Sequence, residues 1–312
     1  TEIYTVLTSS AASDVYKRQL LKRANEQSLE AVNKDKLQAL LTTYEEILAI
    51  QPDHRETLTD LCSYYTLLGA GYTSDRSDKA EVYIQAIRYC EKAMYLNPAF
   101  MQRVDQGENV WEAASLLTAE DADAMGYWAT AVLYYFKEVV PDPLKVFDAR
   151  WMTRARIVME RVETVNPEWS GGANYFNLGI YYLAVPKAMG GDMDKAQAYF
   201  EKSATSGPDW LLTPWGKAKY YYPLTGDRQA FIQDLEWVLA RNPSETGEPY
   251  PWSVYFQTQA SELKAQTDAL FRISTWMMSS CHMGATSPNL CPDYYMYAAF
   301  GFSRIAISTR NN

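Results

Sequence analysis

The sequence predicts an all-α fold: an array of antiparallel helix pairs, closed by a last helix and flanked by short extended tails. Apolar residues recur at helical spacing in successive segments of the chain. Prolines follow these segments at a constant phase. The composition, with 47% hydrophobic and 21% charged residues, is typical of a globular protein. A chain of 312 residues can bury a large core, and we expect the repeat array to form one elongated domain.

The segment 171–208 carries the pattern most completely. One face of a first helix, at the i, i+3, i+4 and i+7 spacing, holds Tyr175, Leu178, Gly179 and Tyr182. One face of a second helix holds Ala196, Phe200 and Ser203. Pro186 ends the first helix, Asp192 can cap the second, and Pro208 follows it. This order of large and small residues is the pattern of a tetratricopeptide helix pair.

The same phase recurs before four other prolines. Counted back from Pro52, Pro98, Pro167 and Pro243, the second-helix positions are Leu40, Tyr44 and Ile47; Ala86, Cys90 and Ala93; Ala155, Met159 and Val162; and Phe231, Leu235 and Val238. Three preceding helices also match, with Leu58, Leu61, Cys62 and Tyr65; Trp128, Ala131, Val132 and Tyr135; and Trp215, Ala218, Lys219 and Tyr222. Five phased matches predict about five helix pairs. After Pro251, residues 252–279 are expected to form a capping helix.

The segments GGANYFNLGIYYLAVPKAMGGDMDKAQAYFEKS and PDWLLTPWGKAKYYYPLTGDRQAFIQDLEWVL resemble the TatT family. These are tetratricopeptide-like extracytoplasmic components associated with some tripartite ATP-independent periplasmic (TRAP) transporters. The positions that match the family pattern are Gly171, Gly172, Gly179, Gly190, Gly191, Asp192, Ala196, Phe200, Phe231 and Leu235. The resemblance covers roughly residues 37–270. It implies an all-α fold, a trimer with a central pore, no catalytic residues and a TRAP substrate-binding protein as a partner.

Charge and hydropathy limit the possible partners and the cellular location of the protein. A net charge of −9 without a cluster of Lys and Arg argues against nucleic acid as a partner. No apolar run of about eighteen residues is present, so we expect no transmembrane segment. No export signal is visible at the N-terminus. The family resemblance nevertheless implies a periplasmic or extracellular protein of bacteria.

The four cysteines form two pairs in the sequence. Cys62 and Cys90 lie on helix faces of one predicted repeat, where buried free thiols are the ordinary expectation and a bridge between the two helices is the alternative. Cys281 and Cys291 flank a loop rich in turn formers, and here we favour a disulfide that closes the loop. A metal site with His282 is less favoured, because the second half of a paired zinc motif is missing.

Both tails fall outside the family pattern. Residues 1–19 are expected to form an extended arm, residues 20–279 the helical domain and residues 280–312 a C-terminal tail. Ile3, Tyr4 and Val6 suit a short strand, and Ile305 and Ile307 alternate in a second possible strand, for which a helix is the alternative. The segment SAASDVYKRQ also resembles translated sequencing-adaptor DNA, so the arm is either native or an artefact of assembly.

The residues that carry chemistry are sparse. Only His54 and His282 exist, and His54 suits the start of a helix better than a catalytic base. Asp75 and Asp78 suit helix capping, because the glycine and final glutamate of an EF-hand loop are missing. No phosphate-binding, dinucleotide-binding or nucleophile motif is present, so we expect no catalytic residue, no metal and no cofactor.

Aromatic side chains remain, with 24 tyrosines and 9 tryptophans. The segment 209–222 holds more of them than one helix face can hide. Four of them are therefore candidates for lining a pore or a subunit interface: Trp210, Trp215, Tyr220 and Tyr221.

Three functions follow from these patterns. The first is a non-enzymatic extracytoplasmic scaffold of TatT type, which binds proteins, self-assembles and passes a ligand through a pore. The second is a subunit of an extracellular fibre whose copies are joined through the terminal strands. The third and weakest is an enzyme that uses acidic residues in an unrecognised pocket.

Overall fold

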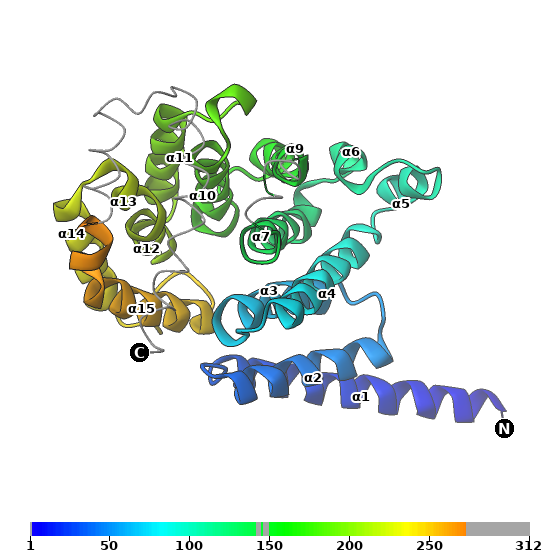
Figure 1. Ribbon diagram of the computed structural model, residues 1–312. Coiled ribbons are helices and arrows are strands. Elements are labelled where there is room, and N and C mark those ends of the chain that lie inside the picture. Colours follow the sequence, from blue (N-terminus) through cyan, green and yellow to red (C-terminus); the bar gives the residue numbers. More distant parts are fainter. Residues whose placement is uncertain (1, 142–144, 146–149, 273–312) are drawn as a thin grey trace. The chain divides into compact units, whose positions relative to one another are not determined.

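The computed structural model describes residues 2–141, 145 and 150–272 (Figure 1). These residues form helices and no strand, as expected for an all-α fold. The chain divides into two compact units, Thr1–Tyr135 and Phe136–Asn312. Each unit has its own set of packed helices.

Unit 1 contains two helix pairs and a short-helix extension. The first pair is α1 (Glu2–Ser28) with α2 (Lys34–Ile50), and the second is α3 (Arg55–Tyr72) with α4 (Arg76–Met94). The extension is α5 (Pro98–Asp105), α6 (Val110–Ala113) and the 3₁₀ turns Ala114–Leu116 and Ala119–Asp121. Helix α7 (Ala122–Glu138) follows and runs into unit 2.

Unit 2 continues the pattern of pairs. Helix α9 (Arg150–Val165) packs on α10 (Trp169–Ala184), which packs on α11 (Met193–Ser206). A broken helix follows as α12 (Leu212–Gly216), a π-helical turn (Lys217–Tyr221) and α13 (Tyr222–Thr225). Helices α14 (Arg228–Leu239) and α15 (Tyr250–Ala265) complete the unit, and they pack on each other.

The phased second-helix positions form the core of both units. All fifteen predicted positions, from Leu40 on α2 to Val238 on α14, are buried. The most exposed of the apolar ones is Tyr44, at 5%. The small members allow close approach of the paired helix. A Cβ added to Gly179 would lie 2.6 Å from Cε1 of Phe200, so only glycine leaves room for that ring.

Side-chain caps begin the helices where the sequence predicts them. Asp75 accepts hydrogen bonds from the backbone N–H groups of Ser77 (2.8 Å) and Asp78 (3.3 Å) at the start of α4. Asp192 does the same for α11, at 3.0 and 3.1 Å. His54 is the N-cap residue of α3, so its imidazole is a capping group there. These three interpretations are confirmed.

The extended arm predicted for residues 1–19 is wrong, because the backbone is helical from Glu2 to Ser28. Leu20 and Ala24 anchor this helix by burial at the contact with α2. Adding residues to an existing helix fixes few dihedrals per new hydrogen bond, and α1 contains no proline or glycine to stop it. The β-branched residues near Ile3 and Val6 carry only a weak preference for strand, which this propagation overrides.

The predicted first helix of the fifth pair is not continuous. Between α12 and α13 the backbone N–H of Tyr222 bonds to the carbonyl of Lys217, which is the spacing of a π-helix. Pro223 has no N–H to donate to the carbonyl of Lys219, so a regular α-helix is interrupted there. Despite this interruption, three of the residues on the predicted helix face are buried: Trp215, Ala218 and Tyr222.

Candidate functional site

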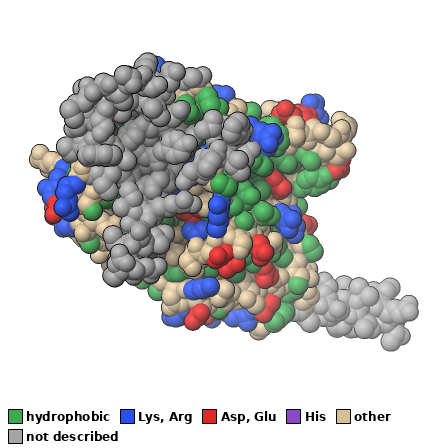
Figure 2. All heavy atoms as spheres, in the orientation of Figure 1, with side chains coloured by type: hydrophobic (Ala, Val, Ile, Leu, Met, Phe, Trp, Pro, Cys, Tyr) green, Lys and Arg blue, Asp and Glu red, His purple; other side chains and the backbone are tan. Residues whose placement is uncertain are grey.

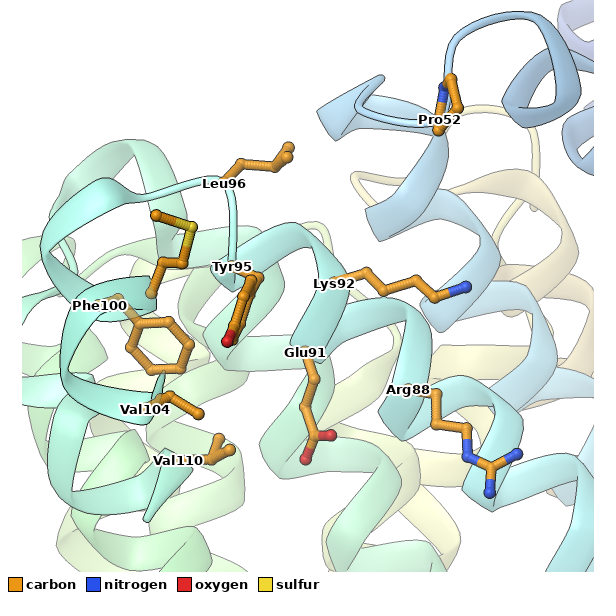
Figure 3. A pocket seen from close by; sticks show the side chains of 10 residues that line it. Pro52, Arg88, Glu91, Lys92, Tyr95, Leu96, Phe100, Val104 and Val110 are labelled. Carbon is orange, nitrogen blue, oxygen red and sulfur yellow. The ribbon is translucent and has the colours of Figure 1, made fainter. Parts of the chain in front are cut away.

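An open groove lies in unit 1, between α4, α5 and α6. We call it the α4–α6 groove; Figure 3 shows it from close by, and its volume is about 600 Å³. Its apolar side chains come from the junction before α3, the end of α4, α5 and α6: Pro52, Leu96, Phe100, Met101, Val104 and Val110. Such a volume lies within the usual range of ligand sites.

Polar side chains of α4 line the other part of the groove. These side chains are spaced three or four residues apart, so they lie on one face of α4 and its C-terminal end. They are Arg88, Glu91, Lys92 and Tyr95 (Figure 3). Arg88 and Lys92 are exposed. Glu91 instead accepts a hydrogen bond from Nε1 of Trp128 at 3.1 Å. Burial raises the pKa of Glu91, while the Trp128 bond and Arg88 oppose that rise.

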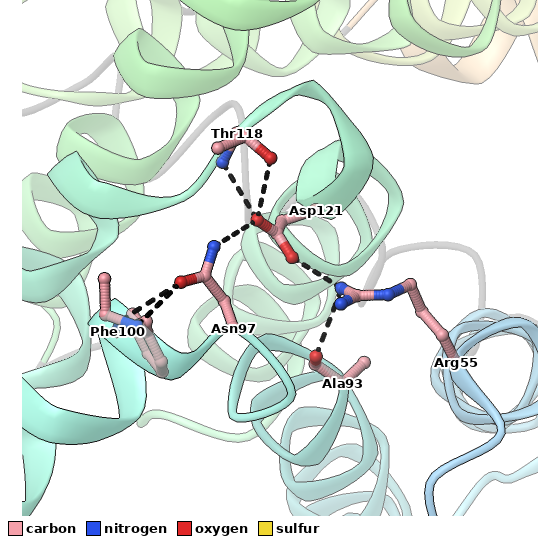
Figure 4. A network of polar contacts seen from close by, with 7 residues as sticks. Arg55, Ala93, Asn97, Phe100, Thr118 and Asp121 are labelled. Carbon is pink, nitrogen blue, oxygen red and sulfur yellow. Dashed lines mark hydrogen bonds and ion pairs between the residues drawn. The ribbon is translucent and has the colours of Figure 1, made fainter.

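A buried polar network positions α5 at the edge of this groove (Figure 4). Asp121 is 1% exposed and forms an ion pair with Arg55. Its other carboxylate oxygen accepts hydrogen bonds from Nδ2 of Asn97 (2.9 Å) and from the backbone N–H of Thr118 (2.9 Å). Oδ1 of Asn97 in turn caps α5 through the N–H of Phe100 at 3.3 Å. The network therefore ties α3, the start of α5 and the following 3₁₀ turn together.

Unit 1 also contains a tyrosine pair that shares one carboxylate. The rings of Tyr65 and Tyr89 stack with centroids 5.6 Å apart. Both hydroxyls donate to Oε1 of Glu45, at 2.6 and 3.2 Å. Nζ of Lys92 lies 5.2 Å from the Tyr89 ring centroid. Burial is the main cause that raises the pKa of both tyrosines, which keeps them protonated as donors.

Unit 2 contains a similar cluster, in which the glutamate stands at a different position of its helix pair. Tyr182 and Tyr199 stack with centroids 5.5 Å apart, and the hydroxyl of Tyr199 donates to Oε2 of Glu163 at 3.1 Å. Nζ of Lys202 lies 4.7 Å from the Tyr199 ring centroid. Tyr199 directly precedes Phe200, as Tyr89 precedes Cys90, so these two tyrosines hold the same place in the repeat. The clusters bind the second helix of one pair to the preceding pair.

The structure pairs Cys62 with Cys90 in a disulfide that links α3 to α4. Their Cα atoms lie 5.5 Å apart. Both cysteines are 0% exposed. The ordinary expectation of two free thiols is therefore wrong here, and the alternative of a bridge between the helices is correct. Helix pairing brings together two face positions that are 28 residues apart in the chain.

Two of the four candidate pore or interface aromatics are buried within unit 2. Trp215 is 1% exposed and packs on Phe256, with ring centroids 4.6 Å apart. Tyr220 is 9% exposed, and its hydroxyl accepts a hydrogen bond from Nζ of Lys137 at 2.8 Å. Core packing thus accounts for both. Trp210 and Tyr221 keep part of their surface exposed, so an interface role for them stays a prediction.

Trp210 occupies a cradle made by glycines. Its indole ring lies where a Cβ on Gly171 or Gly247 would clash with it, and a Cβ on Gly207 would lie only 3.0 Å from it. Gly171 also has a positive φ of 60°, a conformation that suits glycine. Next to this cradle, Oε1 of the buried Glu248 accepts a hydrogen bond from the backbone N–H of Leu212 at 2.8 Å. The glycines at residues 171–172 therefore allow the contact with Trp210 as well as the kink near the start of α10.

Several expected features lie outside the described residues: the Cys281–Cys291 disulfide, the strand around Ile305 and Ile307, and the tail 280–312. Within residues 2–141 and 150–272, no group of three or more His, Cys, Asp or Glu could hold a metal ion. None of the helices among them is long and apolar enough to cross a membrane. On the face drawn in Figure 2, acidic and basic side chains are interspersed with apolar ones.

The helix pairs, their phased core and the caps define an all-α helical-repeat protein. The model of the TRAP transporter T-component family matches residues 25–271, and the chain therefore belongs to that family. It is thus a component associated with TRAP transporters, as the resemblance in the sequence implied. Comparison with curated proteins gives no match.

The α4–α6 groove was missed at the level of sequence. Its signal was present in part, since Arg88, Lys92 and Tyr95 share one stripe of a predicted helix. The position of α5 beside this stripe depends on the contact between Arg55 and Asp121, which are 66 residues apart. No local pattern reports such a contact.

Proposed function

We propose that this T-component works in the periplasm or outside the cell as a binding protein without catalysis. It would hold a TRAP substrate-binding protein and assemble with further copies of itself. The observation that carries the location is the Cys62–Cys90 disulfide, because such bridges persist in oxidising compartments. Membership of the T-component family supports the transporter partner.

Self-association would use the partly exposed aromatics of unit 2. The hydroxyl of Tyr221 donates to Oε1 of Gln197 at 3.1 Å, and its ring meets Phe200 edge-on, so its position is fixed before any partner arrives. A rigid, half-exposed tyrosine is a favourable interface side chain, because little conformational entropy is lost on binding. A closed ring of copies would enclose the ligand-passing pore that the family resemblance implies.

The fibre hypothesis loses one of its two supports. It requires an N-terminal strand, and residues 2–28 form helix α1 instead. A helix already paired with α2 offers no open strand edge to a neighbour. We therefore do not propose a fibre as the function of this protein.

Partner binding can be measured directly. The purified, disulfide-bonded chain is titrated against a TRAP substrate-binding protein by biolayer interferometry. We expect saturable binding, which is lost when a substrate-binding protein from an unrelated ABC transporter replaces it. Absence of binding to the TRAP protein would overturn the proposed function.

Self-association has a separate test in sedimentation velocity. We expect a discrete oligomer for the wild type and a shift toward monomer for Tyr221→Ala. Tyr16→Ala is the matched control, because Tyr16 is an exposed tyrosine of α1, at 50%. A wild type that stays monomeric at all concentrations contradicts the self-assembly, as does equal behaviour of the two variants.

A further inference from the structure

We infer that the α4–α6 groove docks an acidic, amphipathic helix of a protein partner. The inference rests on the proposed function, because it assigns a surface and a chemistry to the binding of the TRAP substrate-binding protein. The groove joins an apolar part, formed by α5, α6 and the end of α4, to two exposed cations on α4.

The apolar part of the groove exposes two large side chains to solvent. Met101 is 39% exposed and Tyr95 is 36% exposed, while Phe100 beneath them is fully buried. The Tyr95 and Phe100 rings meet edge-on, with centroids 6.4 Å apart. Exposed apolar side chains over a packed floor, rimmed by polar residues, mark a protein interaction site.

The charges along the groove differ between its two ends, which determines how a charged partner would be oriented in it. Arg88 and Lys92 are exposed in a protein of net charge −9. The acidic residue between them, Glu91, is turned toward the indole of Trp128, and burial raises its pKa. Asp105 is the acidic group at the other end, where its carboxylate accepts a hydrogen bond from the hydroxyl of Tyr95. An occupant would therefore place its carboxylates near Arg88 and Lys92 and keep them away from Asp105.

The spacing along α4 suits a helix as the occupant. Arg88, Lys92 and Tyr95 are four and three residues apart, so the stripe extends about 10 Å along the helix axis. A partner helix that presents apolar residues at i, i+3 and i+4 would fill the groove beside Met101, with acidic residues one turn further on. The polar network of Arg55 and Asp121 holds α5 in place, so the groove exists before the partner binds.

The test reverses the two cations of the groove. We expect the double variant Arg88→Glu with Lys92→Glu to weaken binding of the TRAP substrate-binding protein about tenfold or more, since like charges would then face each other. The matched control is Lys22→Glu with Lys34→Glu, which changes the net charge equally at exposed positions of α1 and α2. Thermal melts of both variants check that the fold is retained.

A photo-crosslinker in place of Met101 identifies the occupant. We expect it to label one segment of the partner that carries carboxylates beside apolar residues, as read by mass spectrometry. A label on a second copy of this chain, or on a segment without carboxylates, would overturn the inference. So would equal binding by the groove variant and its control. The wild-type titration separates the two proposals. If the wild type does not bind the partner at all, the proposed function is wrong; if it binds and the groove variant binds equally well, only the groove inference is wrong.

Discussion

Cys62 of α3 and Cys90 of α4 form a disulfide between the two helices of one repeat. Cys90 stands at a phased position where the other repeats have a larger apolar residue: Tyr44, Met159, Phe200 and Leu235. The bridge thus replaces part of the core packing with a covalent link.

Removing this bridge should destabilise unit 1. We expect reduction of the disulfide to lower the free energy of unfolding by about 2–4 kcal/mol, because it closes a loop of moderate length. Urea unfolding with and without a reductant measures the change. The double variant Cys62→Ala with Cys90→Ala is the control, and it should not respond to reductant. An equal response of both proteins would contradict this account of the bridge.

Gly179 should not tolerate a side chain while Phe200 remains. We expect Gly179→Ala to lower the free energy of unfolding by about 1–3 kcal/mol, because the new methyl group overlaps the Phe200 ring. The double variant with Phe200→Leu tests the cause. If the clash is responsible, adding Gly179→Ala to Phe200→Leu costs less than it does in the wild type; additive costs would refute the clash.

Removing Arg55 should lower the stability of the fold, because its ion-pair partner Asp121 is buried. Arg55→Ala leaves the carboxylate of Asp121 buried with part of its partners, and we expect a loss of about 1–3 kcal/mol in unfolding free energy. Arg103→Ala, which breaks an exposed pair with Glu108, should cost less than about 1 kcal/mol. Chemical denaturation compares the two variants. Similar losses would mean that the network does not fix the start of α5.

Asp60 should make stability depend on pH. Burial, the largest cause, raises its pKa from 3.8 to about 6, with Glu56 and Asp123 adding repulsion and the hydrogen bond from Tyr44 opposing the rise. The folded state therefore binds more protons than the unfolded state between these values, so this group's stabilisation is complete below 3.8 and is lost as the pH rises through about 6.

The variant Asp60→Asn isolates that contribution. We expect wild type minus Asp60→Asn to show a larger unfolding free energy at about pH 5 than at about pH 7.5, as urea unfolding would measure it. The subtraction cancels the pH-dependent contributions of other buried carboxylates, such as Glu91, whose pKa is also raised by burial. A difference that does not change with pH would show that Asp60 keeps its ordinary pKa.

Local periodicity accounts for what could be predicted about the fold. The phased positions from Leu40 to Val238 are buried, and the caps at Asp75 and Asp192 form as expected, because each depends on residues within one or two helical turns. Prediction failed where propensity was weak. Ile3 and Val6 favour a strand only slightly, and propagation of α1 from its buried anchor Leu20 overrides them.

The sequence by itself thus determined the class of fold and the phase of each helix pair, because these are recorded in residue spacing. It also identified the T-component family, through the motifs that match that family. Only the tertiary structure decided that Cys62 meets Cys90, that Asp121 is buried against Arg55, and that α5 lies beside Arg88 and Lys92 to form a groove. Those contacts join segments far apart in the chain, and their free energy depends on burial and geometry that exist only once the helices have packed.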